Sequence, residues 1–284
     1  MKFTKIHGIG NDYIYFNCLD TDISDPNGLS IALSDRHFGV GGDGIVMIMR
    51  SNVADFRMRM FNADGSEGKM CGNATRCIGK YVFEKGLTNK TEFTLETLGG
   101  IKKLELQVEN GEVKSVKVDM GKAILNPAEI PVLLDGENVV GREVIVGGNK
   151  HEITCVSMGN PHCVIFTENI DDLDLEKIGP KYENDPIFPE RVNTEFVEII
   201  DKNVLKMRVW ERGSGETWAC GTGASAVCVA AVLKGICDYN TDVTIKLRGG
   251  DLVINYMDDG TVFMSGPATF VFDGETDKEF DIYA

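Results

Sequence analysis

The sequence predicts an α+β protein that contains two copies of one domain, and two observations support this expectation. The first is a pair of Cys-Gly dipeptides, Cys71-Gly72 and Cys220-Gly221, which stand 149 residues apart. Each dipeptide follows a short alternating segment and a polar turn, and each precedes apolar residues at helical spacing. The second observation is that the residues around the two dipeptides repeat at the same spacing.

This repeat is long enough to indicate an internal duplication. Residues 57–86 and 206–235 agree at seven of 30 aligned positions. At about 6% identity by chance, roughly two matches are expected, so duplication is the better explanation. The same register places Gly10-Asn11 on Gly159-Asn160. The seven matches are Met58/Met207, Arg59/Arg208, Glu67/Glu216, Cys71/Cys220, Gly72/Gly221, Lys85/Lys234 and Gly86/Gly235.

Each cysteine is expected at the junction of a strand and a helix. Residues 57–61 and 206–210 alternate between polar and apolar side chains, which predicts strands with one buried face. Lys-Gly pairs at 85–86 and 234–235 predict where the two helices end. Asn11 and Asn160 are expected in loops. The other expected segments are loops at 62–68 and 211–215 and strands at 13–17, 92–95, 102–108, 114–119, 163–167, 243–247, 252–256 and 261–264.

Composition excludes several classes of protein. The 284 residues, 43% of them hydrophobic and 26% charged, suffice for two modest cores. A net charge of −15 disfavours binding to nucleic acid or anionic lipid, which depends on clustered Lys and Arg. The longest apolar run, near residues 224–233, is too short to span a bilayer, and no secretion signal is evident at the start. We therefore expect a cytoplasmic protein with neither nucleic acid nor a membrane as partner.

The eight cysteines lack the dense, regular spacing of a disulfide framework, so reduced thiols are expected. Cys71 and Cys220 are distinguished by their position at a predicted helix start. The others are interpreted as small buried hydrophobic residues: Cys18, Cys77, Cys155, Cys163, Cys228 and Cys237.

Thiols at helix starts are suited to proton transfer. A helix N-terminus with unpaired backbone N–H groups favours a thiolate and also binds a carboxylate. If both helix starts face one cleft, two thiols flank one bound ligand. Charge that flows from an α-carbanion into a carboxylate would then meet preorganised donors. One thiolate could remove the α-proton of an amino acid while the opposed thiol returns a proton, which inverts the centre without a cofactor.

Several motifs together give the chain an end-to-end resemblance to the diaminopimelate epimerase family. The resemblance implies interconversion of LL- and meso-diaminopimelate, in lysine and peptidoglycan precursor synthesis, without cofactor or metal. The motifs are His7-Gly8-Ile9-Gly10-Asn11-Asp12, Asp35-Arg36-His37, Phe61-Asn62-Ala63-Asp64-Gly65-Ser66, Cys71-Gly72-Asn73, Gly159-Asn160-Pro161-His162, Arg191-Val192-Asn193-Thr194, Glu211-Arg212-Gly213 and Cys220-Gly221-Thr222-Gly223.

The resemblance also implies roles for individual residues. Cys71 and Cys220 would be the acid/base pair, and His162 and Glu211 would adjust its protonation. The Arg212 guanidinium suits bidentate binding of a distal carboxylate. The implied substrate-binding residues are Asn11, Asn62, Gly72, Asn73, Asn160, Asn193, Glu211, Arg212, Gly221 and Thr222.

For the fold, the expectation is two pseudo-symmetric domains, each a curved, mostly antiparallel sheet around a central helix. The first domain is expected to comprise residues 1–120 and 267–284, because the resemblance implies that the tail after Pro267 returns to pack on it, and the second residues 121–266. The family implies a homodimer. Many members carry Gln where this chain has Gly44, so no side-chain contact is carried over to that position.

Simpler interpretations exist for single residues. Asn11, Asn160 and Asn193 could be turn residues that bind their own backbone. His162 could be a hydrogen-bonded core residue. Glu67 and Glu216 are expected to be counter-charges for Lys or Arg and are left out of the site. A zinc site would need cysteines from two separate helices, so no metal is expected.

Two other functions compete with the epimerase. Proline racemases and hydroxyproline epimerases use a similar cysteine pair, but the asparagine-rich loops and Glu211-Arg212 fit a long substrate with a second charged end better. A thiol redox or disulfide-exchange protein would also explain two reactive cysteines at helix starts. It would not need the carboxylate-binding groups around them.

Overall fold

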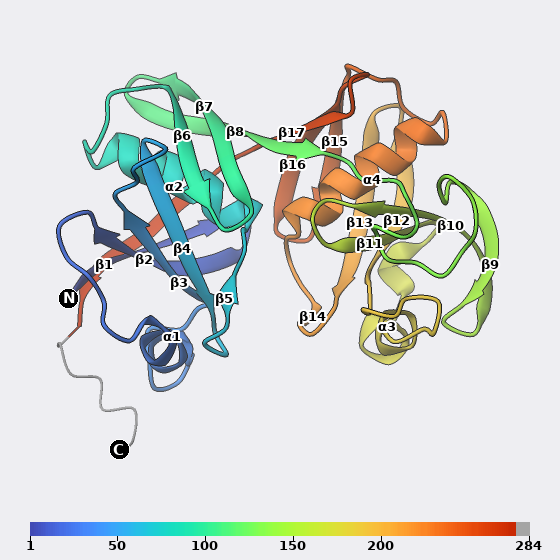
Figure 1. Ribbon diagram of the computed structural model, residues 1–284, viewed down its shortest axis with the longest axis horizontal. Helices are drawn as coiled ribbons and strands as arrows, with labels where there is room; N and C mark the ends of the chain where they lie inside the picture. The colour runs from blue at the N-terminus through green and yellow to red at the C-terminus, as the bar shows by residue number, and fades with distance from the viewer. Residues whose placement is uncertain (277–284) are drawn as a thin grey trace. The chain divides into compact units, whose positions relative to one another are not determined.

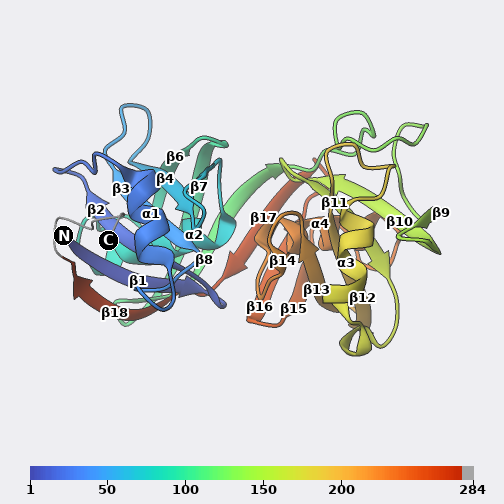
Figure 2. The ribbon, with the colours of Figure 1, turned by 90° about the horizontal axis from the view of Figure 1, so that it is seen from below.

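A computed structural model describes residues 1–276 of the chain, which form two compact units. Within the described residues, the first unit comprises 1–118 and 266–276, and the second comprises Asp119–Ser265. Each unit contains one sheet, one long helix that begins after a cysteine, and one shorter helix (Figures 1 and 2).

The sheet of the first unit has the strand order β18-β1-β2-β3-β4-β6-β7-β8. Neighbours are antiparallel except for the parallel pairs β2–β3 and β4–β6, and the short β5 pairs with β4. The strands are β1 (Lys2–Gly8), β2 (Asn11–Cys18), β3 (Gly44–Met49), β4 (Phe56–Asn62), β5 (Glu67–Gly68), β6 (Glu92–Thr97), β7 (Gly100–Glu109), β8 (Glu112–Lys122) and β18 (Thr269–Glu275).

The second unit repeats this topology with the order β9-β10-β11-β12-β13-β15-β16-β17. Its parallel pairs, β11–β12 and β13–β15, occupy the corresponding places, and the short β14 pairs with β13. The strands are β9 (Arg142–Val146), β10 (Asn149–Ser157), β11 (Pro161–Phe166), β12 (Asn193–Asp201), β13 (Val204–Glu211), β14 (Gly215–Glu216), β15 (Asp242–Leu247), β16 (Gly250–Tyr256) and β17 (Thr261–Gly266).

A long helix forms the centre of each unit. Helix α2 (Gly72–Glu84) packs against β1, β2 and β7, and because β1 and β7 are far apart in the strand order, the sheet curves around the helix. Helix α4 (Gly221–Leu233) packs similarly against β10, β11, β12, β15 and β16. Small and apolar residues on α4 allow this enclosure, since its residues from Gly223 to Val232 are all buried. The predicted two-unit α+β fold is confirmed.

Helix α1 (Pro26–Ser34) was not predicted, and the acidic stretch 171–177, which includes the start of helix α3 (Leu175–Glu183), was expected only as a solvated helix or loop. Helix α1 packs against β3 and β4, and helix α3 packs against β12, β13 and β14 after a single 3₁₀ turn, η1 (Ile170–Asp172). Both occupy the same place in the repeat, 149 residues apart at each end. Pro180 inside α3 and the glycine in each helix weaken the sequence signal for a helix.

The structure corrects the expectation for Asn11, which is the first residue of β2 and not a loop residue. Gly8 and Asn11 are paired across a two-residue turn, in which Ile9 (φ 50°) and Gly10 (φ 91°) both have positive φ. Such turns match the twist of the strands, so pairing continues to the turn. Asn160 does lie in a loop, because β10 and β11 are joined by three residues.

The two expected loops, 62–68 and 211–215, were wrong at both ends, because β5 and β14 also begin inside them. Asn62 ends β4 and Glu211 ends β13, where a loop was expected to begin. The chain after Pro267 returns to the first unit as β18, which pairs with β1. Residues 277–284, also assigned to the first domain, lie outside the described residues.

None of the helices within residues 1–276 is long and apolar enough to cross a membrane.

Candidate active site

Both candidate catalytic cysteines are the N-cap residues of the central helices. Cys71 and Cys220 have extended backbone conformations directly before the first helical residue. The Sγ atom of Cys71 accepts the backbone N–H of Ala74 at 3.5 Å, and that of Cys220 accepts the N–H of Gly223 at 3.3 Å. Each sulfur therefore interacts with the positive end of a helix.

Asn11 and Asn73 surround Cys71 and form with it and Asp43 what we call the Cys71 cluster. Asn11 Oδ1 accepts hydrogen bonds from Cys71 Sγ at 3.5 Å and from Asn73 Nδ2 at 3.3 Å. The Nδ2 group of Asn11 donates to Asp43 Oδ2 at 2.7 Å. The structure thus brings three predicted residues together and fixes which end of the Asn11 amide faces the sulfur.

Charged groups hold this cluster in place. Asp43 Oδ2 also accepts the backbone N–H of Asp12 at 3.1 Å, and Asp43 Oδ1 accepts from Arg36 Nη2 at 3.2 Å. Burial, with the nearby charge of Asp12, raises the pKa of the Asp43 carboxyl. Asn73 Oδ1 accepts from the fully buried guanidinium of Arg76 at 2.9 Å.

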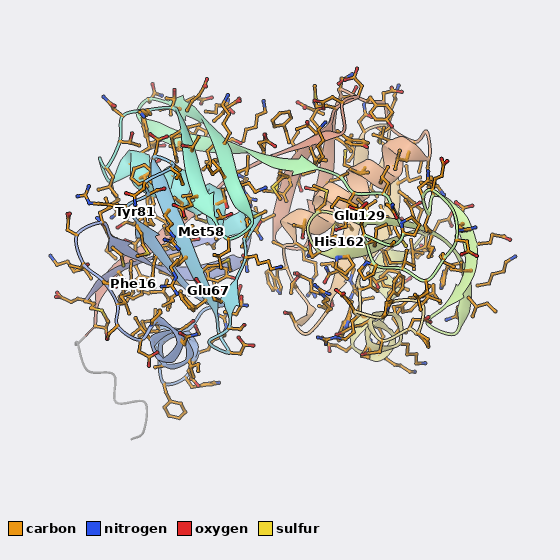
Figure 3. All side chains as sticks on the ribbon, in the orientation of Figure 1. Phe16, Met58, Glu67, Tyr81, Glu129 and His162 are labelled. Carbon is orange, nitrogen blue, oxygen red and sulfur yellow. The ribbon has the colours of Figure 1, made fainter. Side chains whose placement is uncertain are left out.

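The Cys220 cluster consists of Cys220, Thr222, Asn160, His162, Glu195 and Glu211. Thr222 Oγ1 lies 3.5 Å from Cys220 Sγ and accepts from Asn160 Nδ2 at 3.3 Å. Asn160 Oδ1 lies 3.1 Å from His162 Nε2. His162, labelled in Figure 3, is fully buried. Thr222 corresponds to Asn73 in the repeat and Asn160 to Asn11, but the contacts differ, because Thr222 contacts the second sulfur whereas Asn11 contacts the first.

Glu211 lies beside the second thiol, and both groups have altered pKa values. Burial raises the pKa of the Glu211 carboxyl, although hydrogen bonds from Thr217 and Cys220 oppose this change. Burial, together with the charges of Glu211 and Glu195, raises the pKa of the Cys220 thiol well above its ordinary value. The sequence argument expected a helix start to favour the thiolate. In this environment, desolvation outweighs the helix start and favours the thiol form of Cys220 over the thiolate.

The other predicted side chains make structural contacts. The buried Asn193 donates through Nδ2 to the carbonyl of Pro161 at 3.0 Å and accepts the backbone N–H of Arg212 at 2.9 Å. It therefore joins the loop before β11 to the loop after β13. Arg212 Nη1 donates to the carbonyl of Glu190 at 2.8 Å, and Asn62 Nδ2 donates to Ser66 Oγ at 3.0 Å.

Backbone groups complete the predicted set. Gly72 and Gly221 are the first residues of α2 and α4, so their N–H groups belong to the unpaired donors of a helix start. Gly44 has φ +152°, and a Cβ added there would lie 2.0 Å from the carbonyl oxygen of Phe61. In this conformation no side chain fits at position 44, which agrees with carrying no contact over to it.

The residues that were left out of the site behave as expected. Arg59 pairs with Glu67, labelled in Figure 3, and Arg208 pairs with Glu216 in the same two-bond arrangement. Both glutamates are therefore counter-charges, as predicted. The six cysteines that were interpreted as core residues are all buried. All eight cysteines are thiols in the structure.

Two supporting residues were missed by the sequence argument, namely Asp43 and Glu195. Asp43 follows the glycine loop, and its contact with Asn11 depends on the pairing of β2 with β3. Glu195 is an acidic residue inside the otherwise apolar and neutral start of β12. A charged residue within a buried strand was the available signal, because such a group needs a partner.

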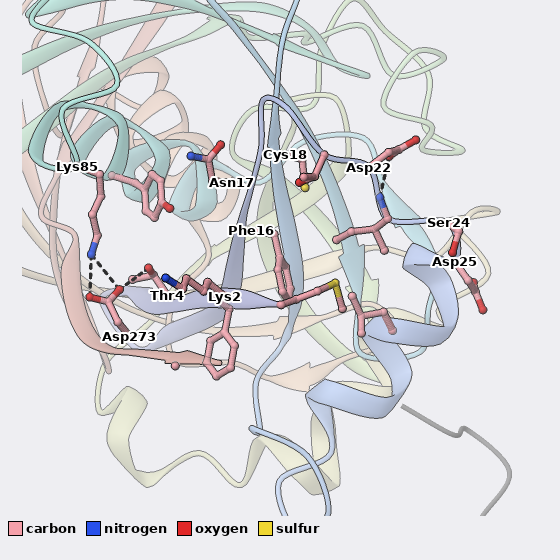
Figure 4. Close-up of a pocket in the computed structure, with 17 residues that line it drawn as sticks. Lys2, Thr4, Phe16, Asn17, Cys18, Asp22, Ser24, Asp25, Lys85 and Asp273 are labelled. Atoms are coloured by element: carbon pink, nitrogen blue, oxygen red, sulfur yellow. Dashed lines mark hydrogen bonds and ion pairs between the residues drawn. The ribbon is translucent and has the colours of Figure 1, made fainter. Parts of the chain in front are cut away.

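A large pocket of about 1280 Å³ lies elsewhere in the first unit (Figure 4). Its lining includes Phe3, Phe16, Asn17, Lys85 and Asp273, and none of the predicted site residues contributes to it. Hydrogen bonds join Lys85 to Asp273 and Asp273 to Thr4 at one side. The pocket is therefore distinct from both cysteine clusters.

Comparison with known proteins is consistent with this arrangement. The sequence model of diaminopimelate epimerase matches residues 3–126 and 154–271, which include every residue of both clusters. The chain belongs to the diaminopimelate epimerase family. The diaminopimelate epimerase of Acetivibrio thermocellus is 57% identical over 278 residues, which cover 98% of this chain and 99% of the relative.

Solved structures with low sequence identity share the fold. A phenazine biosynthesis protein of the PhzF family from Bacillus anthracis has a TM-score of 0.72 at 17% identity, and the match covers 97% of this chain and 98% of the other. A probable proline racemase from Agrobacterium radiobacter has a TM-score of 0.70 at 14% identity, and the match covers 99% of this chain and 94% of the other. At these identities the likeness concerns the fold alone.

Proposed function

We propose that this protein is an epimerase that interconverts LL- and meso-diaminopimelate by proton exchange at the α-carbon without a cofactor. The observation that carries the proposal is the repeated thiol: Cys71 and Cys220 cap repeat-related helices of two units with the same topology. Family membership supports the choice of substrate.

In the proposed reaction, one cysteine begins as thiolate and the other as thiol. The thiolate removes the α-proton, the electron pair of the C–H bond passes into the carbanion, and the thiol of the other cysteine donates its proton to the opposite face. The reverse reaction begins from the exchanged protonation states. Backbone N–H groups at Gly72, Asn73, Gly221 and Thr222 would bind the carboxylate and stabilise the developing charge.

Glu211 would set the state of the second thiol. Glu211 lies beside Cys220, whose sulfur accepts from Gly223 N–H and lies next to the Thr222 hydroxyl. If the proton moves to Glu211, these two donors remain to stabilise the thiolate. The raised pKa of the Glu211 carboxyl favours this transfer, whereas the raised pKa of the Cys220 thiol opposes it.

The remaining predicted side chains would bind the distal end of the substrate. Arg212 provides a planar guanidinium that binds a carboxylate bidentately. The amides of Asn11, Asn62, Asn160 and Asn193 provide donors and acceptors for ammonium and carboxylate groups. The unaltered end of diaminopimelate carries both.

We further propose that the protein works as a homodimer in the cytoplasm. The resemblance to the family suggests the dimer, and light scattering of the purified protein would measure its mass. Eight cysteines without a disulfide are typical of a reducing compartment.

The decisive experiment uses purified, reduced protein with LL-diaminopimelate in D₂O and no added cofactor. We expect α-deuterium to enter together with formation of the meso isomer, and both to be lost in Cys71→Ala and in Cys220→Ala. Exchange with proline or hydroxyproline alone would assign the protein to the racemases of those substrates. Absence of exchange with any amino acid would favour a thiol redox protein.

A further inference from the structure

Glu195 and His162 form a buried pair whose purpose the proposed reaction leaves unexplained. Glu195 lies on β12 and His162 on β11, at neighbouring parallel strands, and both side chains are fully buried. Glu195 Oε1 lies 2.6 Å from His162 Nδ1. This short distance places a single proton between the carboxyl and the imidazole.

The other ring nitrogen has a defined role as a donor. His162 Nε2 faces Asn160 Oδ1 at 3.1 Å, and an amide oxygen can only accept a hydrogen bond. Nε2 therefore carries a proton. The conclusion does not depend on whether the proton between Nδ1 and Glu195 is bonded to the ring or to the carboxyl. In both cases Nδ1 is hydrogen-bonded to Glu195, and the proton that faces Asn160 must be on Nε2.

From His162 the hydrogen bonds continue in one direction to the sulfur. Asn160 uses its oxygen for His162, so its Nδ2 group donates to Thr222 Oγ1 at 3.3 Å. The Thr222 oxygen accepts that bond, and its hydroxyl proton can be donated to Cys220 Sγ, which lies 3.5 Å away. Each donor thus points toward Cys220, and the chain ends in a donor to the sulfur.

The first turn of helix α4 has room for the Glu195 carboxyl because residue 223 is a glycine. A Cβ at position 223 would lie 2.7 Å from Glu195 Oε1, so Gly223 allows the carboxyl to reach the first turn. Within residues 1–276, Glu195 Oε2 is buried without a hydrogen-bond partner. A buried carboxyl oxygen without a hydrogen bond lowers the free energy of unfolding. The corresponding residue in the first unit is Val46, so the buried carboxyl is specific to the second unit.

We propose that Glu195 is a positioning residue for the reaction: it fixes the His162 ring with Nε2 as donor, and the chain through Asn160 and Thr222 directs a hydrogen bond to Cys220. The proposal rests on the proposed function for its effect on catalysis, but the ring orientation can be tested separately. The other ionisable groups near the pair are Glu211, Cys220 and Cys163.

The orientation is tested by ¹⁵N NMR of the full chain labelled at histidine. The chain has four histidines, so the signals can be assigned by comparison with His162→Gln. We expect a protonated Nε2 for His162 in the wild type, and a far-downfield Nδ1 proton that disappears in Glu195→Gln. An unprotonated Nε2 in the wild type would overturn the proposal, whatever the substrate of the protein proves to be.

The catalytic effect is tested by steady-state kinetics on diaminopimelate. In Glu195→Gln we expect kcat to fall about tenfold with KM changed by less than about twofold, since groups that orient a functional residue typically contribute on this scale. Glu195→Asp, which keeps the carboxylate, should recover part of the loss. The matched control is Glu198→Gln on the same strand, where no change is expected.

The outcomes separate the two proposals. If the wild-type protein does not turn over diaminopimelate, the proposed function fails while the NMR result still decides the ring orientation. If Glu195→Gln retains the kcat and pH profile of Glu198→Gln, Glu195 has only a structural role. Should Glu195→Gln fail to fold, the wild-type spectrum decides, and an unprotonated Nε2 would contradict the proposal.

Discussion

The Cys71 and Cys220 clusters share their backbone plan and differ in the groups that hold the asparagine beside the sulfur. In the Cys71 cluster, Asp43 accepts directly from Asn11. In the Cys220 cluster, the position corresponding to Asp43 is Val192, and Asn160 is held through the imidazole of His162. A carboxylate supports both asparagines, directly in the first cluster and through the His162 ring in the second.

A second difference lies directly beside the thiol. Glu211 has no acidic counterpart in the first unit, where the corresponding residue is the neutral Asn62. Cys220 is 4% exposed, whereas Cys71 is only partly buried. A two-base reaction needs one thiol and one thiolate at the start. The duplication therefore places two thiols at equivalent positions, and the neighbouring side chains and the burial make their environments unequal.

Glu211→Gln should reduce the difference between the two thiol environments and should have the largest effect on activity. The amide cannot take the Cys220 proton, so we expect kcat to fall by about 100-fold or more, as for loss of an acid/base partner. Because burial raises the pKa of the Glu211 carboxyl, wild-type activity should rise with pH through a limb above the ordinary range of glutamate. That limb should be absent in the variant.

The matched control at the corresponding position is Asn62→Gln. It changes an uncharged side chain in the first unit and should leave the acid limb in place. Steady-state kinetics from acidic to mildly alkaline pH measure both variants. An unchanged acid limb in Glu211→Gln would show that another group is responsible.

The repeat-related arginines provide a comparison of stability. Arg208 pairs with Glu216 and also donates to the carbonyls of Ile170 and Leu173, both at 2.7 Å. Lysine cannot make these bonds together, so Arg208→Lys should lower the free energy of unfolding by about 2 kcal/mol.

Arg59→Lys is the control for this prediction. Arg59 pairs with Glu67 in a more exposed position, so the loss should be below about 1 kcal/mol. Urea unfolding measures both changes by circular dichroism. Tryptophan fluorescence adds a specific probe of the second unit, because Trp210 and Trp218 both lie there. Equal losses in the two variants would contradict the comparison.

Thiol reactivity should show the smallest effect, about tenfold. Since the thiolate is the reactive form, the raised pKa and burial of Cys220 should make iodoacetamide modify Cys71 about tenfold faster near pH 7.5. Glu211→Gln removes a negative charge beside Cys220, which lowers its pKa and narrows the difference. Peptide mapping by mass spectrometry measures both rates, and faster modification of Cys220 in the wild type would be inconsistent with its environment.

Local patterns allowed much of the site to be predicted. The alternation before each cysteine and the helical spacing after it located both N-caps, and helices α2 and α4 run from Gly72 and Gly221 as expected. The missed elements are helix α1 and strands β1, β3, β5, β9, β10, β12, β14 and β18, and the start of α3 was not distinguished from a loop. The sequences of α1, α3, β1 and β10 carry glycine, proline or few alternating residues, and packing against the sheet stabilises them more than their own propensities do.

By itself, the sequence determined the duplication, the position of each thiol at a helix start, and the family. These features depend on residue identity and short-range spacing, which are visible in the chain. The tertiary structure decided which groups support the thiols. Asp43 reaches Asn11 and Glu195 reaches His162 across parallel neighbouring strands, at 2.7 Å and 2.6 Å, although each pair is about 30 residues apart in sequence. Likewise, the pKa of Cys220 depends on desolvation, which only the packed core produces.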